Sequence, residues 1–165
     1  MKFLPFVWGI GGVIALLAFA LYRLTPHAVD MFDHELGLWH YVGLIASCAF
    51  MAYSEGYKGF QKGFSPRVVA RARHLMTDQA KPHWKWLAPM FCMSYFAAPR
   101  KRKIVVGVLT TFIVLCVILI RFVPQPWRGI LDAGVVVGLS WGIISILCFC
   151  WQAAKGKLEQ SPELE

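Results

Sequence analysis

The residues with the clearest chemical potential lie in and just after a glycine-rich string of aromatic and basic residues, 53–65. Cationic side chains beside glycine backbone amides are the groups with which proteins bind phosphate. The string therefore predicts an anion or lipid-headgroup site formed by Glu55, Lys58, Lys62, Arg67 and Arg71. The favoured interpretation is structural: Glu55 pairs with a Lys or Arg of the basic loop and fixes the angle at which that loop leaves the membrane. The spacing matches no nucleotide-binding fingerprint.

Three further polar residues, His40, Arg121 and Asp132, lie within or at the ends of long apolar stretches. An ionisable residue inside a membrane is a functional candidate by default, so Asp132 is a candidate coupling site for protons or substrate. The favoured alternative is an ion pair of Asp132 with Arg121 or Arg128, which lowers the cost of burial. His40 is expected to hydrogen-bond inside the bundle, because a bis-histidine haem needs a second intramembrane imidazole, which the apolar stretches lack.

The patterns of histidine, acidic and cysteine residues in the sequence do not favour a metal site or a reactive thiol. His27, Asp30 and His34 would share one helical face, but no metal-binding motif is present, and we interpret residues 25–35 as a polar, acidic connection. No C-x-x-C motif occurs, and each cysteine lies in an apolar segment, which is typical of small buried hydrophobic residues (Cys48, Cys92, Cys116, Cys148 and Cys150). We therefore predict neither a cofactor nor a metal site.

The composition indicates that membrane helices must position these residues. Of the 165 residues, 58% are hydrophobic and only 16% are charged, whereas globular proteins carry roughly 25% charged residues. The mean hydropathy is +0.54. These values exclude a soluble enzyme and a disordered basic tail. The net charge of +8 favours contact with anionic lipid headgroups, and no nucleic-acid partner is predicted.

Four apolar stretches are long enough to cross a bilayer, which needs about 20 residues in a helix. Continuous apolar runs without alternation are typical of membrane helices, because the backbone must satisfy its own hydrogen bonds in lipid. The first stretch is longer than the apolar core of a cleaved signal peptide, so we expect it to be retained. The predicted spans are residues 3–24, 36–54, 104–121 and 130–151.

The distribution of Lys and Arg predicts the orientation of these spans. Fourteen of them, including Lys2, lie in residues 1–2, 55–103 and 152–165, whereas the other connections hold Arg23, Arg121 and Arg128. Because cytoplasmic segments carry the excess of positive charge, both termini should face the cytoplasm, as should the loop 55–103 and the tail 152–165. We therefore expect a multi-pass protein of a bacterial-type inner membrane.

The cytoplasmic loop is expected to contain two structured segments. Ser65-Pro66 is a helix-start signal, and the following residues would form a short amphipathic helix with a basic stripe. We predict that this helix lies in the headgroup plane, with a solvated helix as the alternative. The second segment, 84–98, is apolar but too short to span, which indicates an interfacial or shallow re-entrant hairpin.

Small residues in the fourth stretch predict close helix packing. Gly134, Gly138 and Gly142 recur every four residues and form a groove into which another helix can pack. Packing within one bundle is the default, and homodimerisation through this groove is the alternative.

The prediction is thus a single all-α integral membrane domain with four transmembrane helices, N-in/C-in. We expect a non-catalytic accessory or lipid-contacting scaffold subunit, because no groups are spaced for acid–base, nucleophilic or metal chemistry. Its expected partners are the phospholipid bilayer, anionic headgroups, and a homodimer or larger membrane complex. The alternatives are a small proton- or substrate-coupled transporter, and a lipid-modifying or lipid-translocating protein with a cytoplasmic headgroup site.

Overall fold

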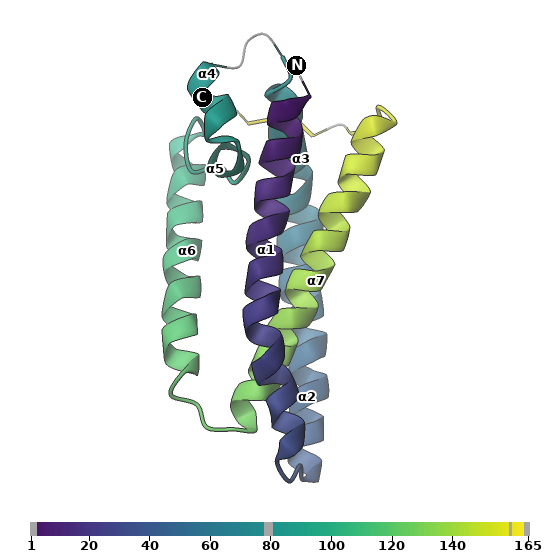
Figure 1. Ribbon diagram of the computed structural model, residues 1–165, viewed down its shortest axis with the longest axis vertical. Helices are drawn as coiled ribbons and strands as arrows, with labels where there is room; N and C mark the ends of the chain where they lie inside the picture. The colour runs from purple at the N-terminus through teal and green to yellow at the C-terminus, as the bar shows by residue number, and fades with distance from the viewer. Residues whose placement is uncertain (1–2, 78–80, 159, 164–165) are drawn as a thin grey trace.

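The computed structural model describes residues 3–77, 81–158 and 160–163, in which all regular structure is helical. Lys2, counted above with the cytoplasmic residues, lies outside this part of the chain. The longest helices run along the long axis of the molecule (Figure 1). They are long and apolar enough to cross a membrane (α1, Leu4–Asp30; α6, Arg100–Ile120; α7, Trp127–Ala154).

The predicted second span differs from the other three. Helix α2 (Leu38–Met51) has only 14 residues before it becomes the π-helical segment η2 (Ala52–Phe64), which passes directly into α3 (Ser65–His74). We call this unbroken run, residues 38–74, the α2–η2–α3 helix. It does not qualify as a span by length and apolarity because the residues of η2 are polar.

The other predicted spans are helical, but their ends differ from those predicted. Helix α1 continues to Asp30 instead of ending at residue 24, and a 3₁₀ turn, η1 (Met31–Asp33), follows it. Most of the predicted acidic connection is therefore helical. Pro26 lies inside α1, where it removes one backbone donor, and the Thr25 hydroxyl one residue earlier donates to the Leu21 carbonyl oxygen at 2.7 Å.

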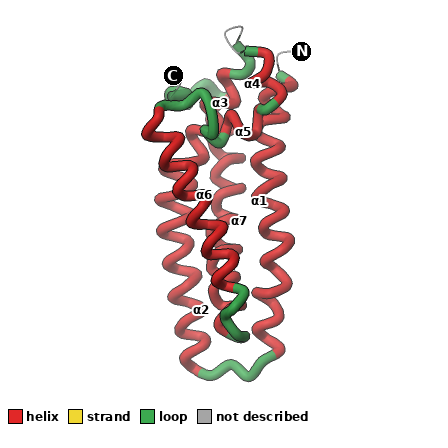
Figure 2. Tube along the Cα trace, turned by 90° about the vertical axis from the view of Figure 1, so that its left-hand side faces the viewer, coloured by secondary structure: helices red, strands yellow, loops and turns green. Residues whose placement is uncertain are grey.

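The two ends of the molecule are formed by different helices and connections (Figures 1 and 2). One end holds both termini together with α3, α4 (Pro82–Trp86) and α5 (Ala88–Cys92), and we call it the α5 end. The opposite end holds the connections 31–37 and 121–126, and we call it the turn end. The four long helical runs connect these two ends.

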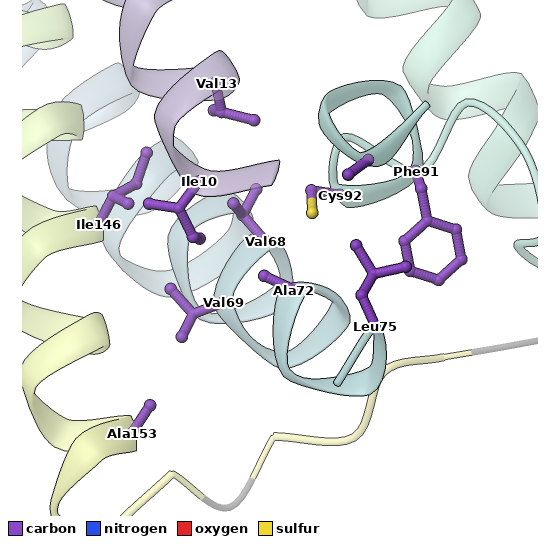
Figure 3. Packing of buried hydrophobic residues seen from close by; sticks show 11 residues of the cluster. Ile10, Val13, Val68, Val69, Ala72, Leu75, Phe91, Cys92, Ile146 and Ala153 are labelled. Atoms are coloured by element: carbon purple, nitrogen blue, oxygen red, sulfur yellow. The ribbon is translucent and has the colours of Figure 1, made fainter. Parts of the chain in front are cut away.

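The hydrophobic core lies at the α5 end, where α1, α3, α5 and α7 meet (Figure 3). Helix α3 is central to it, since residues on several of its faces are buried. The helix predicted after Ser65 is present, but the chain is already helical before this residue and the Ser65 side chain caps no amide. The predicted position of this helix in the headgroup plane stays a prediction. The helix stands upright, because α1, α5 and α7 surround it and it extends the line of η2.

The predicted hairpin segment, 84–98, forms two short helices that meet at Leu87 and pack on α1. The indole nitrogen of Trp8 donates to the Trp86 carbonyl oxygen at 3.1 Å. One turn further along α1, Gly12 lies so close to Pro89 that a Cβ there would overlap the proline ring. Helix α5 therefore lies level with the second and third turns of α1. Its interfacial or re-entrant position in a bilayer stays a prediction.

Two adjacent glycines test this packing. Gly12→Ala should reduce the free energy of unfolding by about 1–2 kcal/mol, because the added methyl group displaces Pro89. Gly11→Ala is the matched control, since a Cβ at Gly11 has no neighbour within 4 Å. Thermal unfolding in detergent micelles measures both. Equal stability of the two variants would contradict the contact between α1 and α5.

Helix α6 stands apart from the other helices (Figure 1), and none of its residues is buried. It is held at the α5 end, where the hydroxyls of Tyr95 and Thr110 hydrogen-bond at 2.8 Å and Arg102 forms an ion pair with Glu163 at 3.0 Å.

An open groove of about 410 Å³ follows α1 below α5 and is lined by Trp8, Gly11, Gly12, Ala15, Leu16, Phe19 and Pro89.

Candidate functional site

The most polar surface away from the two ends is one face of η2. The ammonium group of Lys58 lies 4.9 Å from the ring centre of Tyr53, and that of Lys62 lies 4.6 Å from the ring centre of Tyr57. Both pairs are five residues apart, which is the repeat of the i→i+5 hydrogen bonds of a π-helix. Such cation–π contacts orient the lysines without neutralising them. We call Tyr53, Tyr57, Lys58 and Lys62 the lysine stripe.

The opposite face of η2 packs against α7 at the three glycines predicted to form a groove. Ser47 and Met51 of α2 contact Gly134, Glu55 contacts Gly138 and Phe60 contacts Gly142. The three glycines are buried by the α2–η2–α3 helix, so this groove is filled from within the chain. Homodimerisation through it would have no open surface to use.

Glu55 lies at the middle of the molecule's height. A Cβ at Gly138 would lie 2.7 Å from Glu55 Oε2, and Gly138 precedes the end of α7 at Ala154 by sixteen residues. At about 1.5 Å per residue, Glu55 is about 24 Å below the last turn of α7. Glu55 thus lies beside the middle of α7, because η2 continues the helix alongside α7 instead of leaving it. Its predicted position where the second span meets the cytoplasm stays a prediction.

The lysine stripe begins at nearly the same height. Gly56 lies against Trp141, and the Trp141 indole nitrogen donates to Gln61 Oε1 at 2.9 Å. Lys58, between these two contacts along η2, is thus level with Trp141, which precedes Lys155 by fourteen residues. This corresponds to about 21 Å along α7, so Lys58 lies well below the end of α7, whereas Lys62 lies three residues before α3.

Arg71 is a structural residue of the α5 end. Its side chain is 1% exposed, and its guanidinium stacks on the Phe91 ring at 4.2 Å. Its nitrogen atoms donate to five backbone carbonyl oxygens, those of Phe91, Phe96, Ala97, Pro162 and Glu163, at 2.6–3.2 Å. The guanidinium group is thus the shared donor of all five hydrogen bonds. It joins α3 to the segment after α5 and to the C-terminal tail.

The five residues of the predicted headgroup site do not converge. Glu55 faces α7, Lys58 and Lys62 lie over tyrosine rings, and Arg71 is enclosed by carbonyl groups. Arg67 donates through Nε to the Gly63 carbonyl oxygen at 2.6 Å. These residues are spread along the α2–η2–α3 helix, because the first part of the predicted loop 55–103 is helical.

Asp132 is buried at the turn end and is 1% exposed. Its Oδ2 lies 3.7 Å from Nε of Arg128, one helical turn away. The structure thus pairs Asp132 with Arg128 instead of Arg121, which is exposed at the end of α6. Nearby, Gln125 donates to the His27 carbonyl oxygen at 3.2 Å and accepts from the Gly129 amide at 3.0 Å, which ties α1 to α7.

The pair of Arg128 and Asp132 can be tested by removing one charge and then the other. Arg128→Met should lower the free energy of unfolding by about 1–2 kcal/mol, because it leaves a buried carboxylate without a counter-charge. Asp132→Asn in the same chain should recover most of that loss. Chemical unfolding in detergent measures Arg128→Met, the single variant Asp132→Asn and the double variant. Additive losses in the double variant would show that the two side chains do not interact.

The histidines of the turn end make local contacts. His40 Nδ1 accepts from the Gly37 amide at 3.0 Å, and its ring lies 5.0 Å from that of Trp127. His40 thus caps the start of α2, and the expected position inside the bundle is wrong. His27 Nδ1 lies 3.7 Å from Asp30 Oδ2, and His34 Nδ1 contacts the Asp30 carbonyl oxygen. In the described ranges, no three His, Cys, Asp or Glu side chains are grouped to hold a metal ion.

The π-helical register is the feature that sequence reasoning missed. Residues 53–65 were expected to form a loop-like anion site because of their glycines. A signal was nevertheless present: aromatic and basic residues recur at a spacing of five, as in Tyr53 with Lys58 and Tyr57 with Lys62. Fivefold spacing aligns side chains on a π-helix and separates them on an α-helix, where neighbours are three and four residues apart.

Comparison of the chain with protein-family models, curated proteins and solved structures finds no match. The function is therefore inferred from the residues and their geometry.

Proposed function

We propose that the chain is an accessory subunit of a membrane protein complex in a bacterial-type inner membrane. In this proposal α1, the α2–η2–α3 helix, α6 and α7 cross the bilayer four times, with both termini in the cytoplasm. The turn end then faces outwards, and the basic α5 end faces the anionic lipid headgroups. The excess of Lys and Arg in residues 55–103 supports this orientation.

The observation that carries the proposal is the exposure of Lys58 and Lys62 on the long side of the bundle. Burying a charged lysine in hydrocarbon costs several kcal/mol, which is why such residues face a protein interior or water. Lys58 is about 21 Å from the height of Lys155, further than a lysine side chain can extend to reach headgroups. The charged groups of the lysine stripe therefore need protein next to them in place of hydrocarbon, and a second membrane protein supplies it.

Helix α6 and the groove on α1 support the same conclusion. A 21-residue apolar helix without a buried residue leaves most of its surface open to other helices. The small residues of the groove permit close approach of a second backbone, which stabilises helix association in lipid. The surface available for assembly thus extends beyond the lysine stripe.

The test is the size of the protein in native membranes. An epitope-tagged copy expressed at its natural level should sediment, after extraction in a mild detergent, with a larger membrane protein. A harsh detergent should release it as the 18.6 kDa chain. Sedimentation as the free chain under every mild extraction condition would contradict the proposal.

A proton-coupled transporter is the second candidate, and Glu55 favours it. In the described part of the chain, Glu55 Oε2 is a buried side-chain oxygen without a hydrogen-bond partner. An unpaired carboxyl at this depth is a candidate proton carrier. In liposomes, Glu55→Gln should abolish any proton flux that the chain supports, whereas Glu163→Gln in the tail should not. Absence of flux in the unsubstituted chain would remove this candidate.

A further inference from the structure

The geometry and charge of the lysine stripe restrict which partner can bind to it. Lys58 and Lys62 are four residues apart on one exposed face, and each ammonium group is held over a tyrosine ring of the preceding turn. The cations are thus positioned in advance, which reduces the entropy lost when a partner binds. A cation–π contact does not neutralise the lysine. A partner that excludes water from the two ammonium groups must therefore supply negative charge.

We infer that a transmembrane helix of a different protein packs against the lysine stripe, with Asp or Glu side chains one turn apart opposite Lys58 and Lys62. This inference rests on the proposed accessory function and names the partner's chemistry. Acidic residues three or four positions apart on an α-helix share one face. That spacing would place one carboxylate at each lysine. The Tyr53 and Tyr57 rings would then flank the contact.

Over its described ranges, the chain does not supply these carboxylates itself. Neither lysine forms an ion pair within the described residues. Glu55 contacts Gly138 on the opposite face of η2, and Asp132 lies at the turn end. Glu163 is bound to Arg102 at the α5 end. A second copy packed stripe to stripe would bring like charges together, which disfavours a symmetric dimer through this surface.

Lipid phosphate is a less suitable partner for these charges, because Lys58 lies too deep for headgroups to approach it. Headgroups can approach Lys155, whose ammonium lies 4.6 Å over the Trp151 ring at the α5 end of α7. The same lysine–aromatic arrangement occurs at Lys58, but about 21 Å deeper. Lys155 is therefore a matched control for a lysine over an aromatic ring that lipid alone can satisfy.

The experiment is photo-crosslinking in intact cells from Tyr53→p-benzoylphenylalanine, with Phe112→p-benzoylphenylalanine on α6 as the second position. The crosslinked peptide should be a transmembrane segment carrying Asp or Glu. The adduct should fall at least tenfold in Lys58→Glu/Lys62→Glu and change less than twofold in Lys155→Glu. Lys58→Met/Lys62→Met should also lose the adduct, although methionine is better tolerated by lipid and preserves the fold.

Four outcomes would overturn the inference: an adduct with a second copy, with lipid only, with a segment lacking acidic residues, or one that survives the Met substitutions. The failure of the proposed function has a different signature. A chain that sediments alone and crosslinks to no protein from either position contradicts both. A chain that sediments with a partner and crosslinks only from Phe112 retains the accessory function and loses the inference.

Discussion

Arg71→Met should destabilise the α5 end by at least about 3 kcal/mol in the free energy of unfolding. The substitution removes a buried cation that donates to five carbonyl oxygens. Each buried acceptor left without a partner costs about 1–3 kcal/mol. Methionine keeps the aliphatic part of the side chain, so the loss reports on the hydrogen bonds and on the contact of the guanidinium group with Phe91. We expect the C-terminal tail to detach first, because Arg71 binds the carbonyl oxygens of Pro162 and Glu163.

Arg67→Met is the matched control, one helical turn earlier on α3. Arg67 donates to one carbonyl oxygen, that of Gly63, and is only partly buried. Its replacement should cost less than about 1 kcal/mol. Thermal unfolding in detergent gives the stabilities, and limited proteolysis of the tail gives the local effect. Similar losses for both variants, with an intact tail in Arg71→Met, would contradict the structural role of Arg71.

Gly142→Leu should separate η2 from α7 and cost about 3 kcal/mol, at the upper end for an overpacked contact. A Cβ at Gly142 would already lie 2.7 Å from the Phe60 ring. That ring is buried and packs edge-on against Phe64 at 5.5 Å, so it has little room to move. The loss should be visible as a lower unfolding midpoint in detergent.

Two further variants define this effect. Gly107→Leu on α6 should not lower stability, because a Cβ there has no neighbour within 4 Å and leucine is the better helix former. Phe60→Ala combined with Gly142→Leu should be more stable than Gly142→Leu alone, since the smaller residue makes room. If Phe60→Ala only added to the loss, Gly142 and Phe60 would not be in contact.

Much of the helical architecture could be predicted because length and apolarity alone determine it. The helices α1, α6 and α7 follow from apolar runs of about 20 residues, and the residues after Ser65 are helical as predicted, although the helix does not begin there. The small-residue groove of α7 is also present, and its occupants come from within the chain. These features depend on local patterns, which a sequence contains directly.

The site could be predicted only in part, because it depends on how far the helix that begins with α2 continues. The polar residues from Tyr53 to Lys62 resemble a loop when only composition is considered. The contacts of Glu55 with Gly138 and of Phe60 with Gly142 place them beside the middle of α7 instead. Arg71 is similar, since an amphipathic pattern does not show that carbonyl groups from residues 91–97 and the tail will surround the basic stripe.

The central claim is that η2 lies at bilayer depth beside α7. A nitroxide spin label at Lys58→Cys, in protein reconstituted into liposomes, measures this depth from its relative collisions with oxygen and a water-soluble nickel complex. Labels at Phe112→Cys on α6 and at Lys157→Cys in the tail serve as the membrane and water references. The account predicts that the label at position 58 reports a depth close to that at position 112. A label at position 58 as accessible to nickel as the one at position 157 would contradict it.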